Sequence, residues 1–350
     1  MPNPSAGRPN MQQIADAAAV SKSAVSLALR NDPRIPEATR RRIQQVAEKM
    51  GYQRNPVVDT LMSQLRAGRQ PGFQANLALI NCAPFEDLNS NETFKRLREG
   101  VLKRSQKLGY GVEEFWLQKP DLRPQRLKQI LDTRGIRGIV LVGILGLDEI
   151  DDEKFALFYN GFACAVIGTA QLNKQINCST NDQYLTARRA TRKVLEMGYR
   201  RPILVIPEAD DAVLENKFSA GFYSIVKSLP KRDQLEAISL EPGSAKQASK
   251  AVKARQADVI ITNQSAFYQD LLDSGLNIPE DVGFVHLDWH AGLKEMAGMR
   301  QNNKVVGQVG VDLVVGQLQR NEFGAQEFPQ VVEIESIWVD GSSLPAVETV

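Results

Sequence analysis

The spacing of apolar residues divides the chain into a front of short helices and a longer region of alternating strands and helices. In the front, small apolar side chains recur every three or four positions, which is the period of an amphipathic helix. Ser21 is a suitable N-cap for the second helix, Pro36 suits the start of the third, and only Ala19 and Val20 separate the first two. This arrangement predicts a helix-turn-helix, whose second helix enters the major groove of DNA. The stretches that carry this helical pattern are residues 11–19, 22–30 and 36–50.

A fourth short helix is predicted between this front and the larger region. Asn55 is a suitable N-cap, Pro56 suits the first helical position, and Gly68 can end the helix. A capped helix at this place is unusual for a simple linker. On the pattern alone, the front helices also fit a small bundle that binds another protein.

From residue 75 onward, short apolar runs alternate with helical segments in two series. Runs this apolar are expected of strands that are buried on both faces of a parallel, doubly wound sheet. We therefore predict an α/β fold with two lobes and a cleft between them. A last long helix is predicted to return to the first lobe, so that the chain crosses between the lobes three times. The predicted strands are 75–82, 111–117, 138–143, 163–168, 201–206, 235–240, 258–263 and 282–288. The predicted helices are 92–110, 123–134, 152–161, 183–199, 215–229, 245–255, 266–275 and 304–321.

Charge is distributed unevenly along the chain. Residues 1–72 hold 11 Lys and Arg against 5 Asp and Glu, whereas residues 73–350 hold 32 against 36. A basic front suits a polyanion such as DNA. No apolar run is long enough to span a bilayer, and the first ten residues carry no hydrophobic signal, so we expect a cytoplasmic protein without a membrane partner.

The sequence holds no motif for catalysis, a metal or a cofactor. Glycine motifs that cradle phosphates or expose a nucleophilic serine are missing, so no enzyme activity is predicted. Cys82, Cys164 and Cys178 lack CxxC spacing, which favours reduced thiols in or near the core. His286 and His290 flank an aspartate, but the first falls in a predicted strand and the second in a loop, so a metal site is not predicted there.

Three stretches resemble the LacI/GalR family of bacterial transcription regulators. IADAAAVSKSAVSLAL is similar to its helix-turn-helix, IPEATRRRIQQVAEKMGY to its third helix, and NPVVDTLMSQL to its hinge helix. The resemblance implies a homodimer that binds a pseudo-palindromic operator in double-stranded DNA. It places the family's base-reading positions on Lys22, Ser23 and Leu27, and its phosphate-contacting positions on Ser21 and Ser26.

The residue types on the second helix fit a DNA contact. The face opposite its apolar stripe carries short polar side chains and Arg30, which allow close approach to the DNA backbone. Lys22 can reach a guanine edge, whereas Leu27 offers only apolar contact, for example to a thymine methyl. Ala19 occupies a turn position where the family usually has glycine, so a positive φ there would carry modest strain.

The hinge stretch implies a second contact with DNA. Leu61 matches the leucine that two subunits insert into the minor groove, Val57 matches a position where paired hinge helices touch, and Asn55 is a further predicted DNA contact. Unstacking a base step costs on the order of a few kcal/mol, which the extra bound surface offsets. Packing of Leu61 against the large domain is the alternative. Arg66 and Arg69 either add phosphate contacts or form a solvated flank.

The larger region resembles the family's effector domain, which is similar to periplasmic sugar-binding proteins. Ligands of such sheets bind beyond the carboxyl ends of the strands. Asp182, Asn263 and Asp288 match effector-pocket positions, with loop capping and hydrogen bonding between the lobes as the alternative roles. Trp289 either stacks on a sugar or closes the cleft by packing. Phe218 stands where sugar- and purine-binding relatives commonly carry an arginine, so the sequence does not determine the identity of the ligand.

Together these features predict a transcription regulator with domains at residues 9–54 (DNA binding), 55–74 (hinge helix and linker) and 75–341 (effector binding and dimerisation). We expect a homodimeric repressor that responds to a small molecule, for example a sugar; induction and corepression both fit the sequence. The alternative is a solute-binding or enzyme-like α/β protein whose basic helices dock another protein. Steep weakening of duplex binding with salt would favour the regulator.

Overall fold

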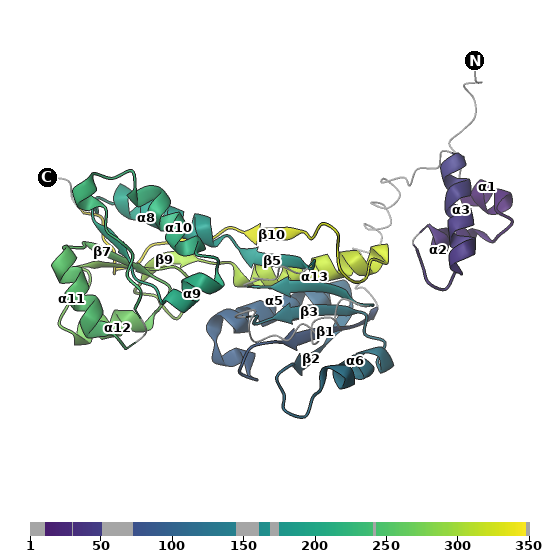
Figure 1. Cartoon of the computed structure of the whole chain (residues 1–350), viewed down its shortest axis with the longest axis horizontal. Helices are drawn as coiled ribbons and strands as arrows, with labels where there is room; N and C mark the ends of the chain where they lie inside the picture. The colour runs from purple at the N-terminus through teal and green to yellow at the C-terminus, as the bar shows by residue number, and fades with distance from the viewer. Residues whose placement is uncertain are drawn as a thin grey trace, which may run out of the picture.

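The computed structural model describes residues 11–29, 31–50, 73–144, 161–168, 175–240 and 243–347. They form a three-helix N-terminal module and two α/β lobes (Figure 1). The predicted hinge helix lies outside these residues, as does the helix predicted over 152–161 except for Gly161. The two-lobed α/β fold behind a helix-turn-helix is confirmed.

The N-terminal module consists of α1 (Met11–Ala17), α2 (Lys22–Ala28) and α3 (Glu37–Lys49), as predicted. Ile14, Val25 and Ile43 are fully buried where the three helices meet, and the other buried residues of this core are alanines. Small side chains let short helices approach closely, so a module of this size still encloses a core. Ala19, in the turn between α1 and α2, has a φ of 50°, which is the left-handed conformation for which glycine is best suited.

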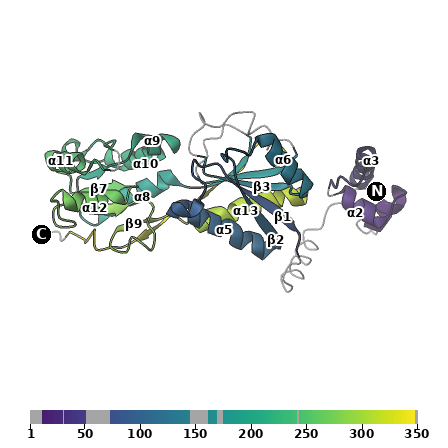
Figure 2. The ribbon, with the colours of Figure 1, turned by 90° about the horizontal axis from the view of Figure 1, so that it is seen from below.

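The N-terminal lobe is a six-stranded sheet in the order β10-β5-β4-β3-β1-β2, with parallel pairing throughout. Side chains alternate along β1: Ala78 and Ile80 face the core under α6, and Leu77 and Leu79 face the core under α5 and α13. The two helical layers lie on opposite faces of the sheet (Figure 2). The elements are β1 (Ala75–Asn81), α5 (Glu92–Leu108), β2 (Tyr110–Trp116), α6 (Pro124–Thr133), β3 (Gly138–Val142), β4 (Ala163–Ile167), β5 (Asn177–Asn181), α13 (Asn303–Arg320), β10 (Val331–Ile334) and the 3-10 helix η1 (Leu88–Ser90).

Helices α5 and α13 touch through their backbones. A Cβ atom at Gly100 would lie 2.1 Å from the carbonyl oxygen of Lys304, and one at Gly307 would lie 2.2 Å from that of Leu97. Both positions therefore require glycine, and this close contact ties the last long helix to the first helix of the N-terminal lobe.

The C-terminal lobe is a five-stranded sheet in the order β11-β9-β8-β7-β6. Phe218 and Phe222 of α10 pack with α8 on one face of the sheet, and Phe267 and Leu271 of α12 pack with α11 on the other. The elements are α8 (Gln183–Glu196), β6 (Pro202–Leu204), α9 (Glu208–Val213), α10 (Lys217–Val226), the 3-10 helix η2 (Lys231–Asp233), α11 (Ala245–Arg255), β7 (Val259–Thr262), α12 (Ala266–Asp273), β8 (Gly283–His286), β9 (Ala297–Arg300) and β11 (Ile337–Val339).

The chain crosses between the lobes at three places, as predicted: from β5 to α8, from β9 to α13, and from β10 to β11. Polar groups connect the crossings. The amide of Asp182 donates to the carbonyl of Ile334 at 3.1 Å, and Asn302 Nδ2 donates to the carbonyl of Glu335 at 3.0 Å. The three segments therefore form one hydrogen-bonded hinge.

Some strand predictions were wrong. The stretch predicted over 235–240 contributes only an isolated bridge from Ile238 to Val205, because β6 ends at Leu204. The strands β5 and β9 were not predicted, and β11 runs antiparallel to β9 in a sheet that is otherwise parallel. The sequence of β5, NCSTN, lacks the apolar run expected of a buried strand, although all five of its residues are buried.

Candidate nucleic-acid interface and interlobe site

Helix α2 is packed on one face only. Val25 and Ala28 are buried against α1 and α3, whereas Lys22 and Ser23 are exposed and Leu27 is half-buried. The side chain of Ser21 accepts a hydrogen bond from the amide of Ala24 at 3.2 Å, which caps the helix as the sequence predicted. The first turn of α2 thus presents a lysine and a serine to solvent from a fixed helix start.

Two side chains of α3 hold the loop that follows α2. Gln44 Nε2 donates to the carbonyl of Ala28 at 3.0 Å and to Asn31 Oδ1 at 2.6 Å, and Arg40 Nη1 donates to the carbonyl of Asn31 at 3.3 Å. These contacts fix the far end of α2 relative to α3. No local sequence pattern singles out Gln44 or Arg40, because a polar residue on a helix gives no sign of which loop it will reach.

Several residues predicted to contact DNA or the second hinge helix lie outside the described part of the chain. This holds for Arg30, for the side chain of Ser26, and for the hinge residues Asn55, Val57 and Leu61. Their roles stay predictions.

The polar residues predicted to bind the effector lie just beyond strand ends, and their side chains already have protein partners. Asp182 caps α8, since its Oδ1 accepts from the amide of Leu185 at 2.8 Å. Asn263 Nδ2 donates to Asp210 Oδ2 at 2.8 Å, while its Oδ1 is buried without a partner among the described residues.

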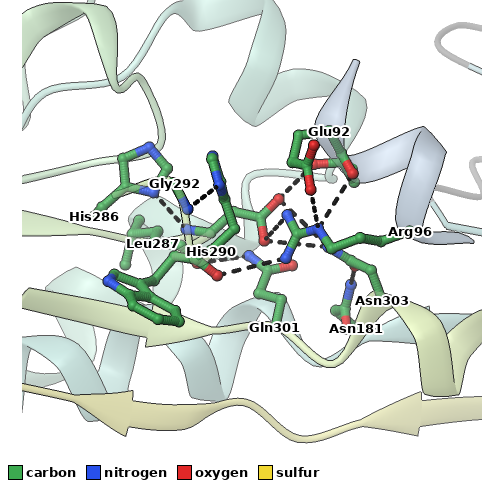
Figure 3. Close-up of polar contacts among 12 residues, drawn as sticks. Glu92, Arg96, Asn181, His286, Leu287, His290, Gly292, Gln301 and Asn303 are labelled. Carbon is green, nitrogen blue, oxygen red and sulfur yellow. Dashed lines mark hydrogen bonds and ion pairs between the residues drawn. The ribbon is translucent and has the colours of Figure 1, made fainter. Parts of the chain in front are cut away.

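Asp288, just beyond β8 of the C-terminal lobe, is contacted by side chains of the N-terminal lobe. Its Oδ2 accepts from Thr93 Oγ1 at 2.5 Å, and its Oδ1 accepts from Arg96 Nη2 at 3.4 Å and from Asn303 Nδ2 at 3.1 Å. Arg96 Nη1 also donates to the carbonyl of Trp289 at 3.5 Å. Figure 3 shows Arg96, from α5, and Asn303, from the start of α13, converging on this site.

The network continues into the hinge through buried amides. Asn181 Nδ2 donates to Asn303 Oδ1 at 2.6 Å, and Gln301 Nε2 donates to the carbonyl of Leu287 at 2.7 Å (Figure 3). Gln183 Nε2 donates to Gln301 Oε1 at 3.0 Å. All four side chains belong to buried residues. Polar groups of the two lobes are therefore connected without a gap from the hinge to Arg96.

His286 lies beside this network and is buried. Its Nδ1 accepts from the amide of Asp288 at 3.1 Å, so Nε2 carries the proton of the neutral ring, and this atom has no partner among the described residues. Burial lowers the pKa of His286 to about 4, against the opposing effect of Asp288. At neutral pH the ring is therefore uncharged.

The two aromatic candidates are held by the C-terminal lobe. The indole of Trp289 donates to the carbonyl of Leu293 at 3.0 Å and is half-buried. Phe218 is 2% exposed and packs in the core between α8, α10 and the sheet. A ligand would reach Phe218 only if that core were rearranged.

Two surface hollows lie away from these residues. One of about 570 Å³ lies against α11 and is lined by Lys246, Lys250 and Lys253. The other, of about 330 Å³, lies at the ends of β1 and β2 beside Asn81 and Trp116. Neither is lined by a predicted effector residue. Within the described ranges, no group of three or more His, Cys, Asp or Glu side chains is placed to hold a metal ion, and no helix is long and apolar enough to cross a membrane.

Comparison with known proteins matches residues 10–55 to a family of bacterial regulatory proteins, the lacI family. No match was found among curated proteins. A solved structure of the transcriptional regulator CelR with cellobiose is 18% identical, with a TM-score of 0.59 over 96% of this chain and 100% of that chain. The lac repressor dimer bound to operator and the anti-inducer ONPF is 16% identical, with a TM-score of 0.56 over 97% and 99%. A LacI-family regulator from Enterococcus faecium with bound ribose is 17% identical, with a TM-score of 0.60 over 77% and 100%.

Proposed function

Because residues 10–55 are a LacI-family domain and the lobes share the fold of LacI-family regulators, we propose that this chain is a sequence-specific, DNA-binding transcriptional repressor. The observation that carries the proposal is the one-sided packing of α2, which leaves its first turn exposed on a basic module. In this proposal the chain is not an enzyme. Its domains are those expected from the sequence: residues 9–54, 55–74 and 75–341.

In this function, α2 reads the major groove. Lys22, Ser23 and Leu27 contact base edges, while Ser21, Ser26 and Arg30 contact the backbone, which fixes the register of the helix on the duplex. The capped start of α2 and the exposure of Lys22 and Ser23 support these roles.

We assign the centre of the operator to the hinge stretch. Leu61 inserts into the minor groove beside Asn55, and Val57 contacts its counterpart in the second subunit. A single recognition helix covers only a half-site, so a two-fold dimer with an inverted-repeat operator follows. The dimeric, operator-bound neighbour structure supports this assembly.

The effector is proposed to bind between the lobes, where Asp182, Asn263, Asp288 and Trp289 end or follow their strands. Carboxylates and amides suit a ligand rich in hydroxyl groups, and neighbour structures hold cellobiose and ribose. Phe218 sits in the lobe's core in place of a charged side chain, so the ligand differs from those that need a guanidinium at that position. Binding there would alter the hinge and so change operator affinity, and DNA would change ligand affinity reciprocally.

Selection from a random duplex library with the full-length protein tests this function. We expect an enriched inverted repeat whose centre is a deformable base step. Enrichment should disappear in a library selected with a chain that lacks the first 72 residues. If only salt-sensitive bulk binding is found, with and without ribose or cellobiose, the specific regulator is contradicted and a protein-docking role of the basic helices is favoured.

A further inference from the structure

The acceptor positions of the Asp288 carboxylate are largely used by protein donors. A carboxylate offers about four lone-pair positions, and Thr93, Arg96 and Asn303 donate to both oxygens of this one. The Arg96 and Asp288 side chains are only 11% and 17% exposed. A ligand that bonds to Asp288 therefore has to displace a donor that is already bound.

All three donors belong to helices of the opposite lobe, and two of them lie away from the chain crossings. Thr93 and Arg96 lie in the first two turns of α5, which packs on the sheet of the N-terminal lobe and is part of no crossing segment. Asp288 belongs to the C-terminal lobe. Their contacts join the lobes in addition to the three chain crossings and depend on the distance between the lobes.

Arg96 is held ready for this contact. Its Nε donates to the carbonyl of Glu92 at 3.2 Å and lies 3.7 Å from Glu92 Oε1. The guanidinium then reaches both the Asp288 carboxylate and the carbonyl of Trp289. Because charges that are largely removed from water interact more strongly than exposed ones, this bridge should outweigh an ordinary surface ion pair.

A second interlobe ion pair provides the comparison. Lys217 Nζ, at the start of α10, lies 3.5 Å from Glu333 Oε1 on β10, and these side chains are 36% and 41% exposed. Lys217 is also 3.6 Å from Glu215. An exposed pair with a competing partner should contribute little.

We propose that Thr93, Arg96 and Asp288 form an interlobe latch that holds the two lobes together while Asp288 carries no ligand. An effector that bonds to Asp288 releases Thr93 and Arg96, so ligand binding and the latched arrangement exclude each other. The lobes become free to change their separation when the effector binds. This inference concerns the regulation of the effector site and rests on the proposed function for the role of Asp288 in ligand binding.

The latch is tested by pulsed electron spin resonance on the full chain without DNA or effector. Spin labels are attached to cysteines introduced at Lys107 on α5 and Lys250 on α11, which are both exposed. The three native cysteines are buried and should stay unlabelled. The labelled chain is diluted with excess unlabelled chain, so that label pairs between the subunits of the proposed dimer do not contribute. We expect one narrow interlobe distance distribution, and a second, longer population when the Thr93→Val and Arg96→Gln substitutions are combined.

Two further variants complete the test. Asp288→Asn, which keeps the shape of the side chain, should produce the same longer population, and Lys217→Gln should leave the distribution unchanged. Circular dichroism shows that each variant is folded; if the double variant does not fold, Asp288→Asn alone decides. An unchanged distribution in folded latch variants overturns the proposal, as does an equal change in Lys217→Gln. Since no DNA is present, failure of the latch is separate from failure of operator binding.

Discussion

The N-terminal module and the interlobe site use polar side chains in opposite ways. On α2, Lys22 and Ser23 are exposed beside a small core of Ile, Val and Ala, so that they are free to contact an external partner. Between the lobes, Asp288 and Asp182 are already bonded within the chain. In the proposed function the module is thus a preformed binding surface, whereas a ligand between the lobes has to exchange internal contacts for its own.

The largest effect should come from the core of the module. Ile43→Ala removes a fully buried side chain from a core whose other large members are Ile14 and Val25, at a cost of about 2–5 kcal/mol. We expect the module to unfold and specific DNA binding to be lost while the lobes keep their melting transition. Calorimetry and binding to the selected duplex measure both. The control Val305→Ala, at a partly exposed position, should change neither the melting of the module nor its DNA binding. Retained DNA binding by Ile43→Ala would show that the module does not depend on this core.

A smaller effect is expected from acid at the interlobe site. The folded-state pKa of His286 is about 4, below its ordinary value of 6.5, because burial disfavours the charged ring. Above pH 6.5 the ring is neutral in both states; as pH falls towards 4, only the unfolded chain takes up the proton, so stability is lost. The loss is on the order of 1.4 kcal/mol per pH unit, or about 3 kcal/mol over this window.

His286→Asn keeps an acceptor for the amide of Asp288 and does not titrate. Urea unfolding followed by tryptophan fluorescence should therefore show a shallower loss of stability between pH 6.5 and 4 in this variant than in the native chain. The matched variant His290→Asn should have a smaller effect. Burial also lowers the pKa of His290, but this ring is only half-buried, whereas that of His286 is buried. Equal pH profiles for the native chain and His286→Asn would contradict a neutral buried ring.

Base reading by α2 is tested next. Lys22→Ala should change the preferred base at one position of each half-site, with a loss of about 1–3 kcal/mol for the original base. Selection from the random library, repeated with this variant, measures the preference. Lys103→Ala, which removes the same charge from an exposed position on α5, should leave the preference unchanged. If Lys22→Ala lowers affinity for every sequence equally, Lys22 contacts phosphate and not a base.

The smallest effect should come from the turn of the module. Ala19 has a φ of 50°, a left-handed conformation that is strained for alanine. Ala19→Gly relieves this strain, and we expect it to raise the free energy of unfolding by up to about 1 kcal/mol after the entropic cost of glycine. Thermal melting of the N-terminal module measures the gain. Ala24→Gly, within α2, should instead lower the melting temperature. A loss of stability in Ala19→Gly would contradict the strain.

Much of the fold could be predicted because apolar periodicity determines it. The strands β1, β3, β4, β7 and β8 are short segments made mostly of apolar residues, and the caps of α2 and α8 are local features of the sequence. The strand β5 could not be found in this way, since its buried asparagines pair with groups that are distant in the sequence: Asn177 accepts from the amide of Gln330, and Asn181 donates to Asn303.

The interlobe site was predicted only in part for the same reason. Asp288 follows a recognisable strand, but its partner Thr93 lies 195 residues away in the sequence, at the start of another helix. Nothing in the local pattern of α5 distinguishes Arg96 from the other basic residues of that helix. Only the folded arrangement shows that an aspartate expected to hold a ligand is already bonded within the chain.

Sequence-specific DNA binding is tested by fluorescence anisotropy with the selected duplex and a scrambled duplex, over a series of salt concentrations. We expect the full-length protein to bind the selected duplex at least about 10³-fold more tightly than the scrambled duplex at physiological salt. Affinity for both duplexes should fall steeply as salt rises, because basic side chains displace counterions from phosphates. Equal affinity for the two duplexes, or affinity that does not depend on salt, would contradict sequence-specific DNA binding by this chain.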